Sequence, residues 1–282
     1  MAMTVREKYV FDVQGYLVVP EFLTPAEVAR LNAGIDANRE KMTEHEGSYL
    51  GESKTLVGEA KRGVLSGMME WAHPWCEPFR ELLAHPKAIP YLNTMHGRGW
   101  RLDHSPVVFY ARKGTEGLKL HGPGHLFDGS QYYIYKNGVM RCGMVSFQYQ
   151  LTDINAGDGG FCCVPGSHRA NYPCPPEILE CAEGEDIVHH VPCKAGDLLI
   201  FNEATTHGTL PWRAEHERRT LMYRFSPKYL HFAGGYYKPQ FPEWVSELTE
   251  AQRAVLEPPY IYNRPLIEPD GETITRPRRD GL

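Results

Sequence analysis

The sequence lacks the features that define several protein classes. No apolar run approaches the roughly 20 residues that cross a bilayer, and Met1 to Lys8 mixes charges without the apolar core of a secretory signal. We therefore expect a cytoplasmic protein with no membrane partner. The formal net charge is −5, without a broad basic excess. This argues against a nucleic-acid polymer as partner, but it does not exclude a small phosphate-bearing ligand bound by a few local cations.

Cysteine pairs of the kind that bind zinc are also missing. The seven cysteines form no CxxC pair, which argues against a structural zinc site. Scattered, odd-numbered thiols are typical of reduced cysteines in the cytosol. The sequence has no internal repeat or low-complexity tract, and its 27 Gly and 22 Pro are spread along the chain, which indicates many turns.

The pattern of the chain changes near residue 100. Before this point, a short strand is expected in Phe11 to Pro20 after a turn at Gly15, and Thr24-Pro25-Ala26-Glu27 predicts a capped helix start. Further helices are expected over residues 75–84 and 89–95. Beyond residue 100, Gly-, Asp-, Asn- and Pro-rich turns separate short strands, expected at residues 107–111, 141–151, 161–164, 187–191, 198–202 and 220–225. This succession is typical of a β-sandwich or jelly-roll barrel.

We expect a single domain over residues 1–282, because no linker interrupts the chain. Its jelly-roll core would span about residues 100–226, with the N-terminal helices packed on the outside. Residues 234–282 are rich in Pro and Tyr and are predicted to form a C-terminal arm, with one helix near residues 249–256.

Four features with chemical potential follow one another in the β-rich half. They are His121 in LKLHGPGH, the turn and strand DINAGDGGFCCVPGSH, His207 in FNEATTHGTLPW, and Arg218, eleven residues after His207. Together with the N-terminal FDVQGYLVVPEFLTPAEVARL and the strand AGDLLIF, this order resembles the phytanoyl-CoA dioxygenase family. The motifs span residues 11 to 226, and several ordered motifs are far more specific than one alone.

The resemblance implies a mainly β fold, the double-stranded β-helix of jelly-roll or cupin type with flanking α-helices. It also implies a non-haem iron(II) enzyme that uses 2-oxoglutarate and O2. His121 and His207 would bind the iron, and Arg218 the far carboxylate of 2-oxoglutarate, since a guanidinium meets a carboxylate bidentately. Neighbouring strand residues point to opposite faces, so only one of Arg218 and Arg219 can serve, and the resemblance favours Arg218. Gln148, expected to face inward, is a further candidate for 2-oxoglutarate or substrate.

The chain departs from the family at the first iron-binding motif. The family's usual motif is His-x-Asp, whereas His121 is followed here by Gly122 and Pro123. Related iron and 2-oxoglutarate halogenases have a small non-ligating residue at this position, and chloride takes the open place. We therefore predict a halide position at Gly122 and Pro123, in a halogenase that chlorinates an unactivated C–H bond of a small molecule. A nucleotide such as deoxyadenosine monophosphate is the substrate hypothesis.

Other interpretations of the missing carboxylate remain open. In one, His125 or Asp128 replaces it and the enzyme is a hydroxylase. In another, water fills the position, and hydroxylation or uncoupled decarboxylation of 2-oxoglutarate would follow. Loss of the metal would leave a non-catalytic binding module, against which the retained histidines and Arg218 argue.

Several neighbouring residues are candidates for substrate contacts. Tyr132 and Tyr133 follow the first histidine and offer ring faces and hydroxyls to a planar ligand, as a lid or mouth. The alternative is a surface hairpin whose rings pack on the barrel. Lys119, with Arg112 and Lys113, is a candidate for a phosphate. Glu203, four residues before His207, would either orient the site from outside the ligand set or face solvent.

Overall fold

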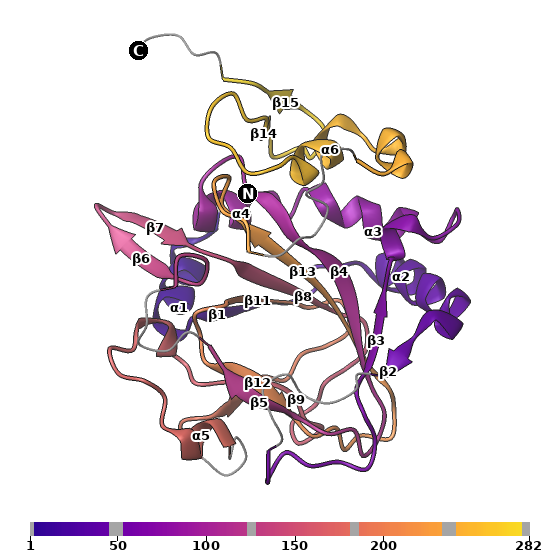
Figure 1. Cartoon of the computed structure of the whole chain (residues 1–282), viewed down its shortest axis with the longest axis vertical. Helices are drawn as coiled ribbons and strands as arrows, with labels where there is room; N and C mark the ends of the chain where they lie inside the picture. Colours follow the sequence, from indigo (N-terminus) through magenta and orange to yellow (C-terminus); the bar gives the residue numbers. More distant parts are fainter. Residues whose placement is uncertain (1–2, 45–52, 123–127, 181–185, 233–240, 278–282) are drawn as a thin grey trace.

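Two antiparallel sheets face each other in the computed structural model, which describes residues 3–44, 53–122, 128–180, 186–232 and 241–277. The larger sheet has seven strands in the order β1 (Tyr16–Val19), β11 (Leu198–Asn202), β8 (Val145–Gln150), β13 (Arg218–Ser226), β4 (Arg101–Ala111), β3 (Gly63–Ser66) and β2 (Thr43–Glu44). The smaller has the order β10 (His189–His190), β9 (Gly160–Cys163), β12 (His207–Leu210) and β5 (Leu118–His121). Figure 1 shows the smaller sheet below the larger one. The predicted double-stranded β-helix is confirmed.

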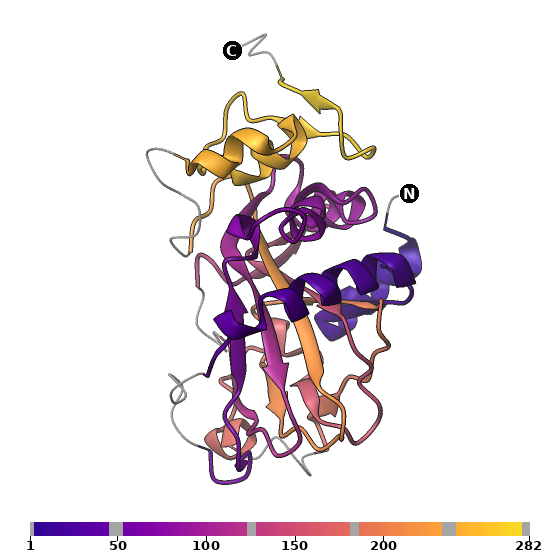
Figure 2. The ribbon, with the colours of Figure 1, turned by 90° about the vertical axis from the view of Figure 1, so that its right-hand side faces the viewer.

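Helices cover the outer face of the larger sheet (Figures 1 and 2). They are α1 (Val5–Gln14), α2 (Pro25–Ala37), α3 (Glu77–Glu81) and α4 (Ile89–His96). α6 (Glu250–Leu256) lies beyond them at the top of Figure 1, and α5 (Pro176–Glu180) lies beside the smaller sheet. Short 3-10 helices are η1 (Arg39–Lys41), η2 (Met68–Glu70), η3 (Leu82–Ala84), η4 (Ser167–Arg169) and η5 (Glu243–Glu247). No helix in the described ranges is long and apolar enough to span a membrane.

Strand alternation divides the interior into two parts. Successive residues of β8 point to opposite faces of the sheet. Phe147 and Tyr149 therefore pack into the large core beneath the helices, whereas Gln148 points toward the smaller sheet and lines a cavity. A second apolar cluster, which includes Phe161 and Phe201, fills part of the space between the sheets. The polar side chains on the inner face, such as Gln148, thus lie between the two sheets.

The N-terminal region contains one helix that was not among the predicted elements, although its start signal is present in the sequence. The expected strand after Gly15 is β1, and α2 starts at the predicted Thr24 cap. Before β1, however, lies α1, which begins with a capping box between Thr4 and Glu7 and ends at Gly15 in the left-handed conformation, with φ 79°. The Thr4-x-x-Glu7 spacing is the signal that predicts this helix start.

The prediction of a C-terminal arm is wrong for residues 241–277. Trp244, Val255 and Leu256 of η5 and α6 belong to the main hydrophobic core. Beyond them, Arg264 is 1% exposed and donates to backbone carbonyls, and β14 (Leu266–Ile267) pairs with β15 (Ile274–Thr275). Burial of one apolar side of α6 therefore packs this segment against the rest of the fold.

Candidate active site

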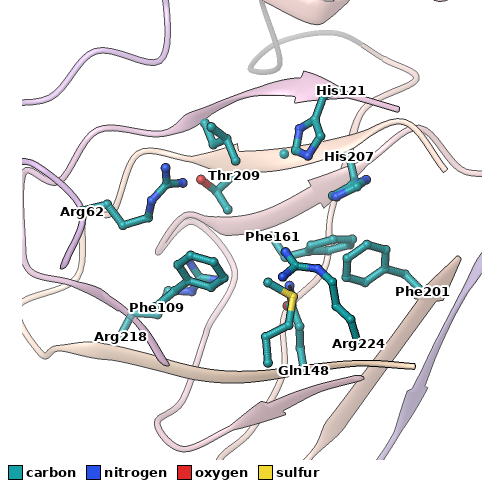
Figure 3. Close-up of a pocket in the computed structure, with 13 residues that line it drawn as sticks. Arg62, Phe109, His121, Gln148, Phe161, Phe201, His207, Thr209, Arg218 and Arg224 are labelled. Carbon is teal, nitrogen blue, oxygen red and sulfur yellow. Dashed lines mark hydrogen bonds between the residues drawn. The ribbon is translucent and has the colours of Figure 1, made fainter. Parts of the chain in front are cut away.

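A small cavity lies between the two sheets. Its volume is about 140 Å³, below the roughly 300–1,000 Å³ of pockets that enclose drug-sized ligands. Its walls are Arg62, Phe109, Leu118, His121, Gln148, Phe161, Phe201, His207, Gly208, Thr209, Arg218, Met222 and Arg224. In Figure 3 the two histidines lie at one end, and Arg62, Phe109 and Arg218 lie at the other. The cavity is thus suited to a small elongated molecule with different chemistry at its two ends.

Strand pairing brings the two predicted histidines together. His207 on β12 lies directly opposite His121 on β5, and the centroids of their rings are 4.3 Å apart. Nδ1 of His207 is 2.7 Å from the Thr205 carbonyl oxygen, and Nδ1 of His121 is 3.2 Å from that of Lys119. When each Nδ1–H donates to its carbonyl, each Nε2 keeps a lone pair, as a metal ligand requires.

The surroundings of the two rings favour the neutral form of imidazole. Burial, reinforced by the neighbouring His207, lowers the pKa of His121 to about 3. Burial also lowers the pKa of His207. Phe201 and Phe161 pack against His207, with ring centroids 4.5 Å and 6.0 Å away. Both histidines are therefore fixed and unprotonated near neutral pH, the state in which imidazole binds metal ions.

Glu203 lies beside the histidine pair. The turn between β11 and β12 buries it, at 5% exposure, and places its Oε2 3.7 Å from Nε2 of His207. Its Oε1 accepts hydrogen bonds from Ser146 Oγ and from Arg224 Nε, the latter at 3.2 Å. Burial raises the pKa of Glu203, but the charge of Arg224 leads a set of interactions that lower it overall. Of the two roles expected for Glu203, exposure to solvent is thus wrong.

Arg218 lies at the opposite end of the cavity and is 4% exposed. Its Nε has no hydrogen-bond partner among the described residues, and the same is true of Oε1 of Gln148. Gly160, at φ +90°, permits this placement, because a Cβ there would stand 3.2 Å from Arg218 Nε. Burial, followed by the charge of Arg62, lowers the pKa of Arg218 to about 10. The guanidinium therefore stays charged at neutral pH and can receive an anion.

Arg219 points away from the cavity, as strand alternation predicts. Its guanidinium lies 2.7 Å from a carboxylate oxygen of Asp36 in α2 and 2.9 Å from one of Glu217. The two adjacent arginines therefore have different surroundings, and only Arg218 reaches the space between the sheets.

Two further arginines, which no sequence motif identified, also line the cavity. Arg62 precedes β3 and lies 5.6 Å from the ring centroid of Phe109. Arg224 shares a strand face with Arg218, and the even spacing of these two positions along β13 is a signal that predicts their common orientation. No comparable local pattern marks Arg62, which reaches the cavity because β3 pairs with β4.

Three residues predicted to contact substrate, Tyr132, Tyr133 and Lys119, are not among those that line this cavity. The hydroxyl of Tyr132 bonds that of Tyr229, and Tyr133, at the start of the β6 (Tyr133–Lys136) and β7 (Val139–Cys142) hairpin, donates to Asp12. The ammonium group of Lys119 forms an ion pair with Glu180. A contact of Tyr132, Tyr133 or Lys119 with substrate thus stays a prediction.

The stretch after His121 is described only in part. Pro123 and His125 lie outside the described residues. Gly122 packs against the β11–β12 turn, where an added Cβ would meet the Thr205 carbonyl oxygen at 3.2 Å. Asp128 belongs to a local turn in which its Oδ1 accepts from the backbone N–H groups of Ser130 and Gln131.

The chain matches the family model described as phytanoyl-CoA dioxygenase (PhyH) over residues 11–220. It belongs to this family. It is accordingly an enzyme of the iron- and 2-oxoglutarate-dependent oxygenase type. No curated protein matches the chain.

Solved structures share the fold of this PhyH-family chain. HygX from Streptomyces hygroscopicus, solved with nickel and 2-oxoglutarate bound, is 24% identical with a TM-score of 0.66, over 82% of this chain and 89% of HygX. The carbocyclase SnoK from nogalamycin biosynthesis is 17% identical with a TM-score of 0.58, over 87% and 91%. The epimerase SnoN from the same biosynthesis is 19% identical with a TM-score of 0.56, over 79% and 82%. HygX has also been solved with hygromycin B bound.

Proposed function

We propose that His121 and His207 bind iron(II), that Arg218 binds 2-oxoglutarate, and that the enzyme uses both to oxidise a C–H bond of a small molecule. The observation that carries this proposal is the polarity of the cavity. Two facing imidazoles, each with Nδ1 at a backbone carbonyl, lie at one end, and a buried guanidinium with an Nε lacking a partner among the described residues lies at the other.

The residues of the cavity fit the two cofactors. Imidazole nitrogens are suitable ligands for iron(II), and a charged, desolvated guanidinium is suited to a carboxylate. Thr209 on β12 and Gln148 on β8 add a hydroxyl and an amide to the cavity from the two facing sheets. An amide turned by 180° presents its NH2 group in place of its oxygen, so Gln148 can serve either a donor or an acceptor of the ligand.

The overall reaction balances with these partners alone. Bound iron(II) supplies the activation of O2, and 2-oxoglutarate is oxidised to succinate and CO2. One oxygen atom enters succinate and the other enters the substrate as a hydroxyl group. The protein holds the far carboxylate of 2-oxoglutarate at Arg218, fixes the imidazoles through their Nδ1 hydrogen bonds, and shields His207 from water with Phe161 and Phe201.

Hydroxylation is the outcome that the geometry supports best, because a buried carboxylate, Glu203, lies beside the histidine pair. Chlorination is the second candidate, and the observation in its favour is that Gly122 and Pro123 follow His121 without a ligating side chain. The cations considered for a phosphate are engaged elsewhere, in ion pairs of Arg112 with Glu44, Lys113 with Glu215 and Lys119 with Glu180. A nucleotide is therefore not favoured over other small molecules.

Succinate release and product mass test this function together. Purified enzyme with iron(II), 2-oxoglutarate and O2 is expected to release succinate, and a library of small molecules should yield a product with one added oxygen atom, with or without chloride. Replacement of a hydrogen by chlorine, only when chloride is present, would support the second candidate instead. No succinate release with any compound would contradict both.

A further inference from the structure

We propose that Glu203 is the carboxylate ligand of the iron, in place of the residue missing after His121. This inference rests on the proposed function and adds the third ligand to it. The result is a set of two histidines and one carboxylate in which the carboxylate comes from the β11–β12 turn instead of the segment after β5.

The distance between Glu203 and His207 is slightly longer than that between two neighbouring ligands of one ion. Metal bonds to imidazole nitrogen and carboxylate oxygen are roughly 2.0–2.2 Å long, so two ligand atoms at right angles on the same ion lie about 3.0 Å apart, and a small shift of either side chain would bring both onto one ion. Oε2 of Glu203 is 3.7 Å from Nε2 of His207, the atom left free to bind when Nδ1 donates to Thr205. His121 stands opposite His207, with ring centroids 4.3 Å apart.

The turn that carries Glu203 is held in place by several hydrogen bonds. The Thr205 N–H donates to the Asn202 carbonyl at 2.9 Å, and the Ala204 N–H to Oδ1 of Asn202 at 2.8 Å. The Thr206 N–H donates to Ser167 Oγ at 2.7 Å. The separation of Glu203 from His207 is thus set by the backbone and does not depend on a mobile side chain alone.

The hydrogen bonds of the carboxylate leave one oxygen directed at the histidines. Ser146 on β8 and Arg224 on β13 are register partners, and both donate to Oε1. Hydrogen bonds of this kind orient a ligating carboxylate from outside the ligand set. A role as the partner of Arg224 alone would explain the contacts of Oε1, but it would not require Oε2 to face His207.

The chain offers a second candidate carboxylate in Asp128, seven residues after His121 in sequence, but its contacts are local. Its Oδ1 accepts from the backbone of Ser130 and Gln131 in its own turn. Within the described ranges, no three His, Cys, Asp or Glu side chains are already spaced as a finished metal site. Iron binding therefore has to draw His121, His207 and Glu203 closer together.

This assignment also bears on the type of reaction. Two histidines and one carboxylate on one face of iron(II) leave the remaining positions for 2-oxoglutarate and oxygen. A carboxylate from Glu203 would thus take the position that chloride needs in a halogenase. The inference accordingly strengthens hydroxylation over chlorination.

Iron(II) affinity of the full-length protein, measured anaerobically by calorimetry, tests the role of Glu203. Glu203→Gln keeps the size and one oxygen acceptor but lacks the charge, and we expect its Kd for iron(II) to rise at least about 10-fold. Glu203→Asp, which keeps the charge for Arg224 but shortens the reach, is expected to weaken iron binding as well. The matched control Asp128→Asn should change the Kd less than about 2-fold.

A second readout separates ligation from a purely structural role. With cobalt(II) in place of iron(II), the ligand-field absorption should change in Glu203→Gln and stay the same in Asp128→Asn. A lower Tm of the metal-free Glu203→Gln protein, with unchanged metal affinity and spectrum, would overturn this inference and leave the proposed function intact. If the wild type bound no iron(II), or His207→Ala bound it equally well, the proposed function itself would fail.

Discussion

Replacing Arg218 by alanine is expected to raise the KM and the Kd for 2-oxoglutarate by about 100-fold or more. Hydrogen bonds to charged groups contribute about 1.5–3 kcal/mol each, and a guanidinium can make two of them with one carboxylate. Two such bonds at the lower limit, about 3 kcal/mol, correspond to roughly 100-fold in affinity. Arg218 is buried, so solvent does little to compensate for the loss. Calorimetric titration of the anaerobic iron(II) enzyme with 2-oxoglutarate measures this effect.

Arg219→Ala is the matched control, because the same side chain is removed from the neighbouring position on the other face. It should lower the Tm slightly through loss of the ion pairs with Asp36 and Glu217, with the affinity for 2-oxoglutarate changed less than about 3-fold. Arg218→Lys keeps the charge without the planar fork and should fall between the wild type and Arg218→Ala. Equal losses in Arg218→Ala and Arg219→Ala would contradict the assignment of Arg218.

Replacing His207 by alanine is expected to lower iron(II) affinity at least about 100-fold and to reduce succinate release to background. Replacing a residue that only orients a metal ligand already lowers metal affinity about 10- to 100-fold. His207 is proposed as a ligand itself, so the loss should be larger. The change also removes the imidazole that faces Glu203 and His121. Anaerobic calorimetry with iron(II) and an assay of succinate measure the two effects.

His168→Ala provides the control for this substitution. His168 is also largely buried, but its Nε2 lies 3.1 Å from the Asp12 carbonyl oxygen and its ring packs against Tyr133. We expect His168→Ala to lower the Tm while iron(II) affinity stays within about 2-fold of the wild type. If His207→Ala retained wild-type iron affinity, His207 would not be a ligand.

Local patterns predicted much of the fold. The Thr24 capping box starts α2, and turn residues separate the strands of the barrel. The strand expected over residues 141–151 is divided into β7 and β8. At the break, the N–H groups of Gly143 and Met144 donate to the carbonyls of Tyr132 and Ser130 in the preceding turn, a pairing that no local pattern describes.

The site was predictable where ordered motifs mark it, and less so where tertiary structure alone brings residues together. His121, His207, Gln148 and Arg218 all line one cavity. Arg62 reaches the same cavity through the pairing of β3 with β4, and the burial of Glu203 depends on how the β11–β12 turn folds back. Tyr132 and Tyr133 are close to His121 in sequence, but their hydroxyls bond Tyr229 and Asp12 and the two residues do not line the cavity.

The central claim is that one cavity holds iron(II) at His121 and His207 and 2-oxoglutarate at Arg218. Anaerobic titration of the enzyme with iron(II) and 2-oxoglutarate, followed by visible absorption, tests it most directly. The account predicts a metal-to-ligand charge-transfer band that saturates in the wild type, is absent in His207→Ala, and needs far more 2-oxoglutarate in Arg218→Ala. A wild type without this band, or a His207→Ala variant that retains it, would contradict the account.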